Sequence, residues 1–378
     1  MRSTGALSGA GGAVKPAGAR RGPGWRRALL GTLALGALAA PAIASGCVAG
    51  FDPPSRVDAL RVFAVVADKP YAHPGDEVTF RIHYQDGFGD EGDAARPVSV
   101  YWFGGCENPI GDDYYGCYED FAALAEEFDG WEEGDPLPEL NGVSPGFGDT
   151  YTIRIGEEIL SSREPPASGP HYGSAFVFFV ACTGTPGPVE DQGTGRAGTF
   201  PIGCFDSNGR RLSADSFVPG YTQVYAFADG RENKNPTIVD LALDGDSMPE
   251  DFGAIREVRR CPLSVEERRE VGCSAPDPFT DCTAHRLEVF VDPEDVAEID
   301  PDAKRQSLKE SVWVNYYADQ GDLDGGIKLV SDASTGYIED HAVTWVPPAE
   351  PGIATITAVL RDVRGGSHVV QRLVRVTE

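Results

Sequence analysis

After about residue 58 the chain repeatedly alternates apolar and polar residues with the period of two that is typical of β-strands. In the first two alternating runs, every second residue is apolar, and a Pro-Gly turn separates them. Period two with many β-branched and aromatic residues indicates strands that bury one face. The strands expected on this basis are 60–66, 78–84, 98–102, 151–155, 175–180, 221–227, 238–243, 287–291, 312–317, 342–346, 354–360 and 369–376.

These strands fall into two groups, and a segment without alternation interrupts each group. The Asn-Lys-Asn-Pro stretch at 233–236 is a turn signal and marks the seam between the groups. The first inserted segment is acidic and aromatic, with a short helical piece around 119–128, and the second carries a capping box at 264–267. We therefore expect one domain at 59–235 with an insertion at about 104–148, and a second domain at 236–378 with an insertion at about 246–283.

Each group carries a tryptophan on a strand near its middle, Trp102 in the first and Trp313 in the second. Several short alternating strands with such a tryptophan resemble the immunoglobulin-like sandwiches that are built in tandem on bacterial surface proteins. The resemblance implies an all-β fold with two immunoglobulin-like antiparallel β-sandwiches in tandem. Each sandwich then has an inserted loop or short-helix segment.

The first 46 residues have the order of charges that is typical of an export signal. Arg20, Arg21, Arg26 and Arg27 precede an apolar run at 28–44, and small residues follow it. The stretch Ala44-Ser45-Gly46-Cys47 resembles the lipobox of bacterial lipoproteins, in which the cysteine thiol takes a diacylglycerol, although Ala44 stands where leucine is usual. The resemblance implies that 1–46 is a cleaved signal peptide, that Cys47 is lipidated, and that 47–58 is a tether.

Other interpretations of this segment stay open. An ordinary signal peptide followed by a structural cysteine has the same overall pattern, and an uncleaved membrane helix needs roughly 20 strongly apolar residues. Arg26 and Arg27 loosely resemble a twin-arginine signal, so export through either the Sec or the twin-arginine route fits. Val48 follows Cys47 in place of the aspartate that retains many lipoproteins at the inner membrane, so we expect a lipid-anchored protein of the outer membrane.

The charge balance limits the class of partner. Six of the 32 basic residues and none of the 59 acidic residues precede Cys47, so the net charge falls from −27 to −33 when 1–46 is removed. A surface this acidic repels phosphate backbones and anionic head groups, and no nucleic-acid partner is expected. Attachment to a membrane then depends on the lipid.

Eight cysteines fit an exported protein in an oxidising compartment, and seven remain if Cys47 is lipidated. The simplest pairing in the first half joins Cys106 to Cys117 and Cys182 to Cys204, whereas the second half leaves one cysteine over. No Cys-x-x-Cys occurs and the histidines are scattered, which disfavours zinc. The disulfide candidates are Cys106, Cys117, Cys182, Cys204, Cys273 and Cys282.

Two acidic or glycine-rich loops raise the question of a bound ion or cofactor. Asp319, Asp322 and Asp324 surround a glycine turn and resemble part of a calcium loop, without its regular spacing or closing glutamate. Calcium is therefore a candidate ion, and a solvated turn is the alternative. The Gly-x-Gly-x-x-Gly sequence at 87–92 is followed by a strand instead of a helix and is flanked by carboxylates, so no nucleotide cofactor is expected.

The first insertion concentrates aromatic residues that either contact a ligand or fix the insertion to its sandwich. No Gly-x-Ser-x-Gly or His-Glu-x-x-His motif occurs, so we do not expect an enzyme. The favoured function is a non-enzymatic binding, adhesion or spacer module with an envelope protein or glycan as partner. The alternative is a glycan-acting hydrolase that uses carboxylates of this insertion, with two of Asp112, Asp113, Glu119 and Asp120 brought within about 5–10 Å of each other. The binding candidates are Tyr114, Tyr115, Tyr118 and Trp131.

Overall fold

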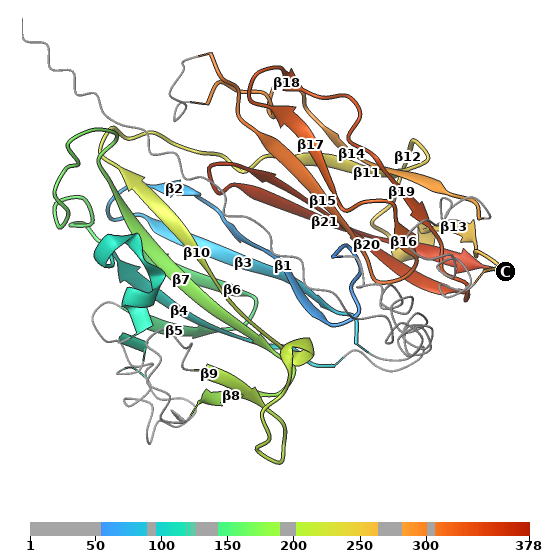
Figure 1. The fold of residues 1–378 in the computed structure, drawn as a ribbon, viewed down its shortest axis with the longest axis horizontal. Coiled ribbons are helices and arrows are strands. Elements are labelled where there is room, and N and C mark those ends of the chain that lie inside the picture. Colours follow the sequence, from blue (N-terminus) through green and yellow to red (C-terminus); the bar gives the residue numbers. More distant parts are fainter. Residues whose placement is uncertain are drawn as a thin grey trace, which may run out of the picture. The chain divides into compact units, whose positions relative to one another are not determined.

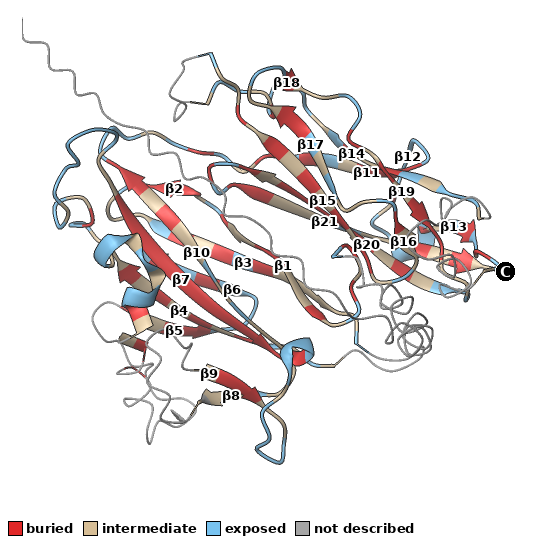
Figure 2. Cartoon of the chain, in the orientation of Figure 1, coloured by how far each residue is buried: buried red, intermediate tan, exposed pale blue. Residues whose placement is uncertain are grey.

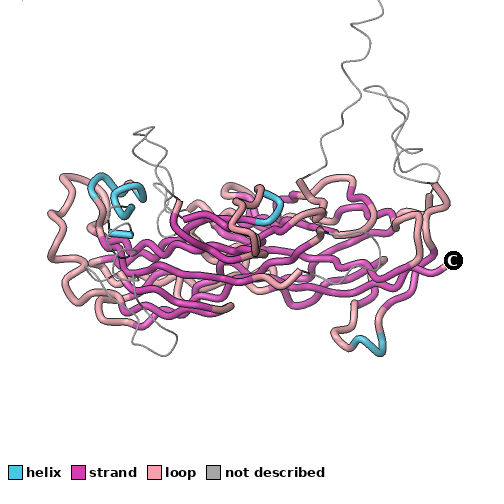
Figure 3. The backbone as a smooth tube through the Cα atoms, turned by 90° about the horizontal axis from the view of Figure 1, so that it is seen from below, coloured by secondary structure: helices cyan, strands magenta, loops and turns pink. Residues whose placement is uncertain are grey.

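Strands dominate the computed structural model of the protein, as Figure 1 and Figure 3 show, and helices are confined to short pieces. The structure describes residues 54–88, 96–118, 120–121, 124, 143–189, 202–263, 282–300 and 307–378. Within these residues no helix is long and apolar enough to span a bilayer.

The first sandwich consists of a three-stranded and a five-stranded sheet, with β1 packed at the edge against β10. The three-stranded sheet has the order β1 (Leu60–Ala67), β3 (Glu77–Asp86), β6 (Thr150–Arg154). The five-stranded sheet has the order β2 (Tyr71–Ala72), β10 (Phe217–Phe227), β7 (Tyr172–Cys182), β4 (Ser99–Glu107), β5 (Ser144–Phe147).

The second sandwich repeats this arrangement with short additions at its edges. One sheet has the order β12 (Asp246–Ser247), β11 (Ile238–Leu243), β14 (His285–Val291), β19 (Val343–Val346), β16 (Asp322–Leu323). The other has the order β13 (Arg256–Arg259), β21 (Ser367–Thr377), β20 (Gly352–Asp362), β15 (Val312–Ala318), β17 (Ile327–Asp332), β18 (Gly336–Tyr337).

The strand order identifies the fold class. In immunoglobulin-type sandwiches, strands A, B and E form one sheet and strands C, F and G form the other. The strands β1, β3 and β6 take the places of A, B and E, and β4, β7 and β10 those of C, F and G. In the second sandwich β11, β14 and β19 correspond to the first set, and β15, β20 and β21 to the second. The predicted all-β fold with two immunoglobulin-like sandwiches is therefore confirmed.

Apolar side chains of both sheets fill each core. In Figure 2 buried residues lie along the strands of both sandwiches. Trp102 on β4 is fully buried and donates from its indole nitrogen to the Gly148 carbonyl at 2.7 Å. Trp313 occupies the corresponding strand β15 but points away from the core, because it falls on the opposite phase of the alternation. The buried tryptophan of the second sandwich is Trp345 on β19, so Trp102 and Trp313 share a strand position, as expected, but not a place in the core.

The insertions lie between particular strands of the sandwiches. The first joins β4 to β5 and begins with two 3-10 helices, Ile110–Asp112 and Tyr114–Cys117, after which the described residues Tyr118, Asp120, Phe121 and Leu124 are helical. The second joins β11 to β14 and holds β12, β13 and the 3-10 helix Phe252–Ala254. Another excursion, between β7 and β10, forms the hairpin of β8 (Thr185–Pro188) and β9 (Ile202–Phe205), then the 3-10 helix Ala214–Ser216. The expected capping box at 264–267 lies outside the described residues.

Disulfides fix these excursions to the sheets. Cys106 pairs with Cys117 and Cys182 with Cys204, with Cα–Cα distances of 5.9 Å and 5.8 Å, as expected from the sequence. In the second half Cys261 pairs with Cys282. Cys261 follows the end of β13 and Cys282 precedes β14, which brings their Cα atoms to 5.3 Å, within bridging distance. The candidate set, which included Cys273 in place of Cys261, is corrected here; Cys273 lies outside the described residues.

The two sandwiches belong to one compact unit, residues 52–378. The strand β1 packs against the outward face of the β15–β20–β21 sheet, where the rings of Phe63 and Tyr317 lie 5.0 Å apart. The segment 228–237, which contains the expected seam, connects β10 to β11. Its Asn235 donates to the Ala67 carbonyl of the first sandwich at 2.7 Å and accepts from the Ser367 amide of the second at 2.9 Å.

Candidate functional site

The outward face of β7 and β10 carries an aromatic cluster that the first insertion partly covers. We call Tyr114, Tyr115, Tyr118 and Tyr221 the tyrosine surface. Three of them come from the insertion, where the Asp113 carboxylate accepts the Tyr115 amide at 3.1 Å and so caps the 3-10 helix. The Cys106–Cys117 disulfide ties the end of that helix to β4.

Ring contacts join the tyrosine surface to the sheet below it. The Tyr114 ring stacks on Tyr221 of β10 at 4.5 Å, and the Tyr118 ring lies edge-on to Phe178 of β7 at 6.0 Å. Tyr115 lies 4.0 Å from Tyr114 and remains 46% exposed, and Tyr221 is 43% exposed. A hydrogen bond with Tyr115 raises the pKa of Tyr114.

The structure brings together three of the four predicted binding residues. Tyr114, Tyr115 and Tyr118 lie side by side, while Trp131 is outside the described residues. Tyr114 and Tyr118 pack against an apolar cluster that includes Phe176 and Phe178 of β7. These two tyrosines therefore fix the insertion to its sandwich, which is one of the two roles expected for the aromatic residues of the insertion. Sequence reasoning missed Tyr221. Its signal was the phase of β10, where Tyr221 occupies a position opposite to the core residues Val224 and Ala226.

A polar network around Asp112 fixes the start of the insertion to β7. Its two carboxylate oxygens accept from Arg163 at 2.5 Å and 2.6 Å, from the Tyr172 hydroxyl at 2.8 Å and from the Ser174 hydroxyl at 3.2 Å. The hydrogen bonds from Arg163 hold the pKa of Asp112 below its ordinary value. Asp112 is left-handed with φ of 56°, a conformation that aspartate tolerates better than most residues.

This network bears on the hydrolase alternative. A general acid for glycoside hydrolysis needs a raised pKa and an accessible proton, and Asp112 has neither because its charged form is the stabilised one. Asp113 is engaged in capping. Glu119 lies outside the described residues. Asp112 and Asp113 thus serve local structure, and Asp120 lies in the helical piece that follows.

Two of the three predicted calcium ligands accept hydrogen bonds from the protein itself. Asp319 accepts the Thr355 amide and the Gln85 side chain, both at 2.7 Å, and Asp324 accepts the Thr344 amide at 2.8 Å. Asp322 lies in β16 and pairs with β19. In the described part of the chain no three His, Cys, Asp or Glu side chains form a metal-binding group. Asp319 and Asp324 thus each accept a backbone amide next to the ends of β15 and β16, and a calcium ion shared by the three carboxylates stays a prediction.

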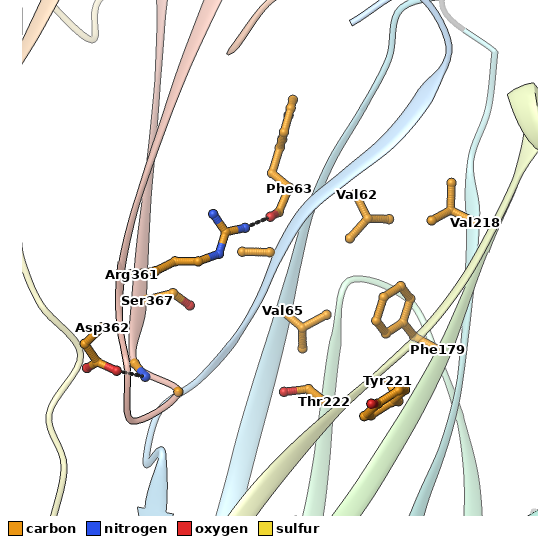
Figure 4. Close-up of a pocket in the computed structure, with 13 residues that line it drawn as sticks. Val62, Phe63, Val65, Phe179, Val218, Tyr221, Thr222, Arg361, Asp362 and Ser367 are labelled. Carbon is orange, nitrogen blue, oxygen red and sulfur yellow. Dashed lines mark hydrogen bonds between the residues drawn. The ribbon is translucent and has the colours of Figure 1, made fainter. Parts of the chain in front are cut away.

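A pocket of about 350 Å³ lies where β1 and β10 meet the turn between β20 and β21 (Figure 4). One side is apolar, with Val65 and Phe179, and the other carries Arg361 and Asp362. Arg361 donates to the Phe63 carbonyl, and Asp362 accepts the amides of the turn and the side chain of Asn233. Arg361 thus joins the two sandwiches, and Asp362 shapes the turn and holds the connecting segment, so we assign this pocket a structural role.

The sequence matches no protein-family profile and no curated protein. Among solved structures, the chain is similar to latent PorU from Porphyromonas gingivalis, with 10% identity over 85% of this chain and 24% of that one, and a TM-score of 0.18. It is also similar to the fibronectin(III)-like modules of Clostridium thermocellum CbhA, with 12% identity, 84% and 94% coverage and a TM-score of 0.17. The Yersinia pseudotuberculosis adhesin InvE gives 12% identity, 85% and 61% coverage and a TM-score of 0.17. The chain thus spans about a quarter of the length of PorU, and the fold assignment rests on the strand order given above.

Proposed function

We propose that this protein is an exported, lipid-anchored envelope protein that binds a partner through the tyrosine surface of its first sandwich and catalyses no reaction. The observation that carries the proposal is the exposure of Tyr115 and Tyr221 within an aromatic cluster that a capped helix and a disulfide hold in place. Tyrosine combines a large apolar ring with a hydroxyl, which makes it a frequent anchor in binding surfaces.

The anchor belongs to the proposal. The lipobox-like sequence ending at Cys47 and the acidic mature chain both favour attachment through lipid, and Val48 favours the outer membrane. Twelve residues separate Cys47 from Leu60, where β1 begins, and they reach at most about 40 Å. The first sandwich and its tyrosine surface then work close to the membrane, on an envelope protein or an envelope glycan.

Capture from envelope extracts tests the binding part. The mature chain, residues 47–378, is immobilised as wild type, as a Tyr115→Ala/Tyr221→Ala double variant and as Phe252→Ala. Phe252 is the control because it is also an exposed aromatic residue, 59% exposed, but belongs to the second sandwich. We expect one partner to be retained by the wild type and by Phe252→Ala and lost from the double variant. Equal retention by all three proteins would contradict the assignment of the tyrosine surface.

Fractionation tests the anchor separately. Cys47→Ala is expected to move the protein from the membrane fraction to the soluble fraction, because the substitution removes the site of acylation. Persistence of Cys47→Ala in the membrane fraction would show that something other than a lipid on this sulfur holds the protein.

A further inference from the structure

A second group of aromatic rings lies on the outward face of β7 and β10, at the end of these strands opposite the Cys182–Cys204 disulfide. It surrounds a slot of about 250 Å³, which we call the aromatic slot. The slot is smaller than the ~300–1,000 Å³ typical of sites for drug-sized ligands, so it accommodates a single ring. Its lining residues are Tyr71, Pro170, Tyr172, Tyr225, Phe227 and Arg231.

Strand register explains why these rings meet. The short strand β2 pairs in parallel with the end of β10, which places Tyr71 beside Tyr225, and β7 pairs Tyr172 with Phe227. The rings of Tyr71 and Phe227 are 4.7 Å apart, and those of Tyr172 and Tyr225 are 5.7 Å apart. Tyr71 and Phe227 are buried, whereas Tyr172 and Tyr225 are half-buried and partly open to solvent.

Two ion pairs flank the aromatic slot. The Arg163 guanidinium lies 4.4 Å from the centre of the Tyr172 ring and is paired with Asp112 through two hydrogen bonds. The Arg231 guanidinium lies 4.8 Å from the centre of the Phe227 ring, and its Nε donates to Asp229 at 3.0 Å. Each positive charge has a carboxylate partner, so these flanking groups add no net charge while they present planar hydrogen-bonding groups beside the rings.

From this combination we infer that the aromatic slot binds one sugar ring of a neutral glycan. The inference rests on the proposed function, because the slot and the tyrosine surface lie on the same outward face of β7 and β10, and it names the class of ligand for that face. The C–H bonds of a pyranose face are polarised and are attracted to the negative face of an aromatic ring. The hydroxyls at the rim of the same sugar then meet the guanidinium and carboxylate groups. Arg163 uses two of its five N–H donors on Asp112.

Charge selects against the competing ligand classes. A mature chain with a net charge of −33 repels acidic polysaccharides, and both flanking arginines are already neutralised. A purely aliphatic ligand covers the ion-paired groups beside the rings without replacing the hydrogen bonds that these groups make to water, which is costly. A neutral sugar satisfies both the rings and the polar groups.

Calorimetric titration of the mature chain tests the inference, with cellotetraose, maltotetraose and chitotetraose as neutral probes and tetragalacturonate as the anionic probe. The variants are Tyr225→Ala, which removes a ring, Tyr225→Phe, which keeps it, and Phe252→Ala as the control in the second sandwich. We expect saturable binding of at least one neutral probe and none of tetragalacturonate. Affinity should fall at least about tenfold in Tyr225→Ala. It should stay within about threefold of wild type in Tyr225→Phe and Phe252→Ala, because both keep the slot's rings.

Absence of binding to all three neutral probes, or equal binding by wild type and Tyr225→Ala, would overturn the sugar assignment. Preference for tetragalacturonate would also overturn it. These results are separable from the capture experiment above, which uses Tyr115 and Tyr221. A captured partner that the double variant loses, together with no oligosaccharide binding, would leave the proposed function standing and remove only this inference.

Discussion

Arg364 and Glu310 form a buried ion pair beside the segment that links the two sandwiches, and Arg364→Met is the substitution whose effect is best defined. The two side chains are 7% and 6% exposed. Arg364 donates from Nε and Nη2 to the two Glu310 oxygens, each at 2.8 Å, and its Nη1 donates to the Glu232 carbonyl at 3.4 Å. Methionine retains most of the volume of the arginine stem but provides no donor, so Glu310 becomes a buried carboxylate without its cation.

Removing one member of a buried pair costs about 3–5 kcal/mol of folding free energy. Burial already raises the pKa of Glu310, and the Arg364 hydrogen bonds counteract this, so the variant raises it further. A folded-state pKa above the unfolded value of about 4.3 means that ionisation favours unfolding. The cost therefore grows with pH, by about 1.36 kcal/mol per unit, until the folded-state pKa is reached. We expect a loss of about 4 kcal/mol at pH 8, the middle of that range, and about 1 kcal/mol at pH 5, which lies about 0.7 unit above the unfolded-state pKa.

Urea unfolding of wild type and Arg364→Met at pH 8 and pH 5 measures this difference. Arg154→Met is the control, because Arg154 and Glu157 form an ion pair with 65% and 71% exposed side chains, which contributes no more than about 1 kcal/mol. A loss below about 1 kcal/mol at pH 8, or an equal loss at both pH values, would refute the reasoning from burial.

Three further predictions follow from single contacts. Replacing Cys182 and Cys204 by alanine opens a loop with a sequence separation of 22 and should reduce the free energy of unfolding, measured in urea, by about 3 kcal/mol. An unchanged free energy would show that the β8–β9 hairpin is stable without the disulfide. Burial lowers the pKa of His83, so protonation favours the unfolded state and stability should fall as pH decreases below about 6.5. His83→Gln should therefore flatten the decrease in Tm between pH 7.5 and 5.5, and parallel Tm curves for wild type and variant would contradict this. Gly104→Ala places a Cβ atom 2.6 Å from Cε1 of Tyr151 and should cost about 1–3 kcal/mol by chemical denaturation, whereas a neutral effect would show that the ring moves away freely.

Local alternation was sufficient to predict the main strands of both sandwiches. The expected runs 60–66, 78–84 and 312–317 correspond to β1, β3 and β15 with small differences at their ends. The prediction for β7, 175–180, was too short. The residues of β7 that point away from the core are apolar as well, so the strand shows no alternation that marks its ends. The insertion and the β8–β9 hairpin cover that outward face, so both faces of β7 are buried and the alternation disappears.

The β8–β9 hairpin and the aromatic slot depend on tertiary contacts and could not be predicted from local alternation. The hairpin β8–β9 has the sequence Thr-Pro-Gly-Pro in its first strand, which shows no strand pattern, and the Cys182–Cys204 disulfide fixes it. The aromatic slot joins residues from 71 to 231 through a two-residue parallel strand, whose pairing no local pattern reports. Its one local signal was the phase of Tyr225 and Phe227, which face away from the core on β10.

The proposed function in the envelope requires that the chain work outside the cytoplasm, held by lipid on Cys47. Mass spectrometry of the N-terminal peptide from protein recovered in the membrane fraction tests this most directly. We predict a peptide that begins at Cys47 and carries the added mass of a diacylglycerol and an N-acyl chain. An unmodified Cys47 thiol, or a peptide that still contains residues 1–46, would contradict the account.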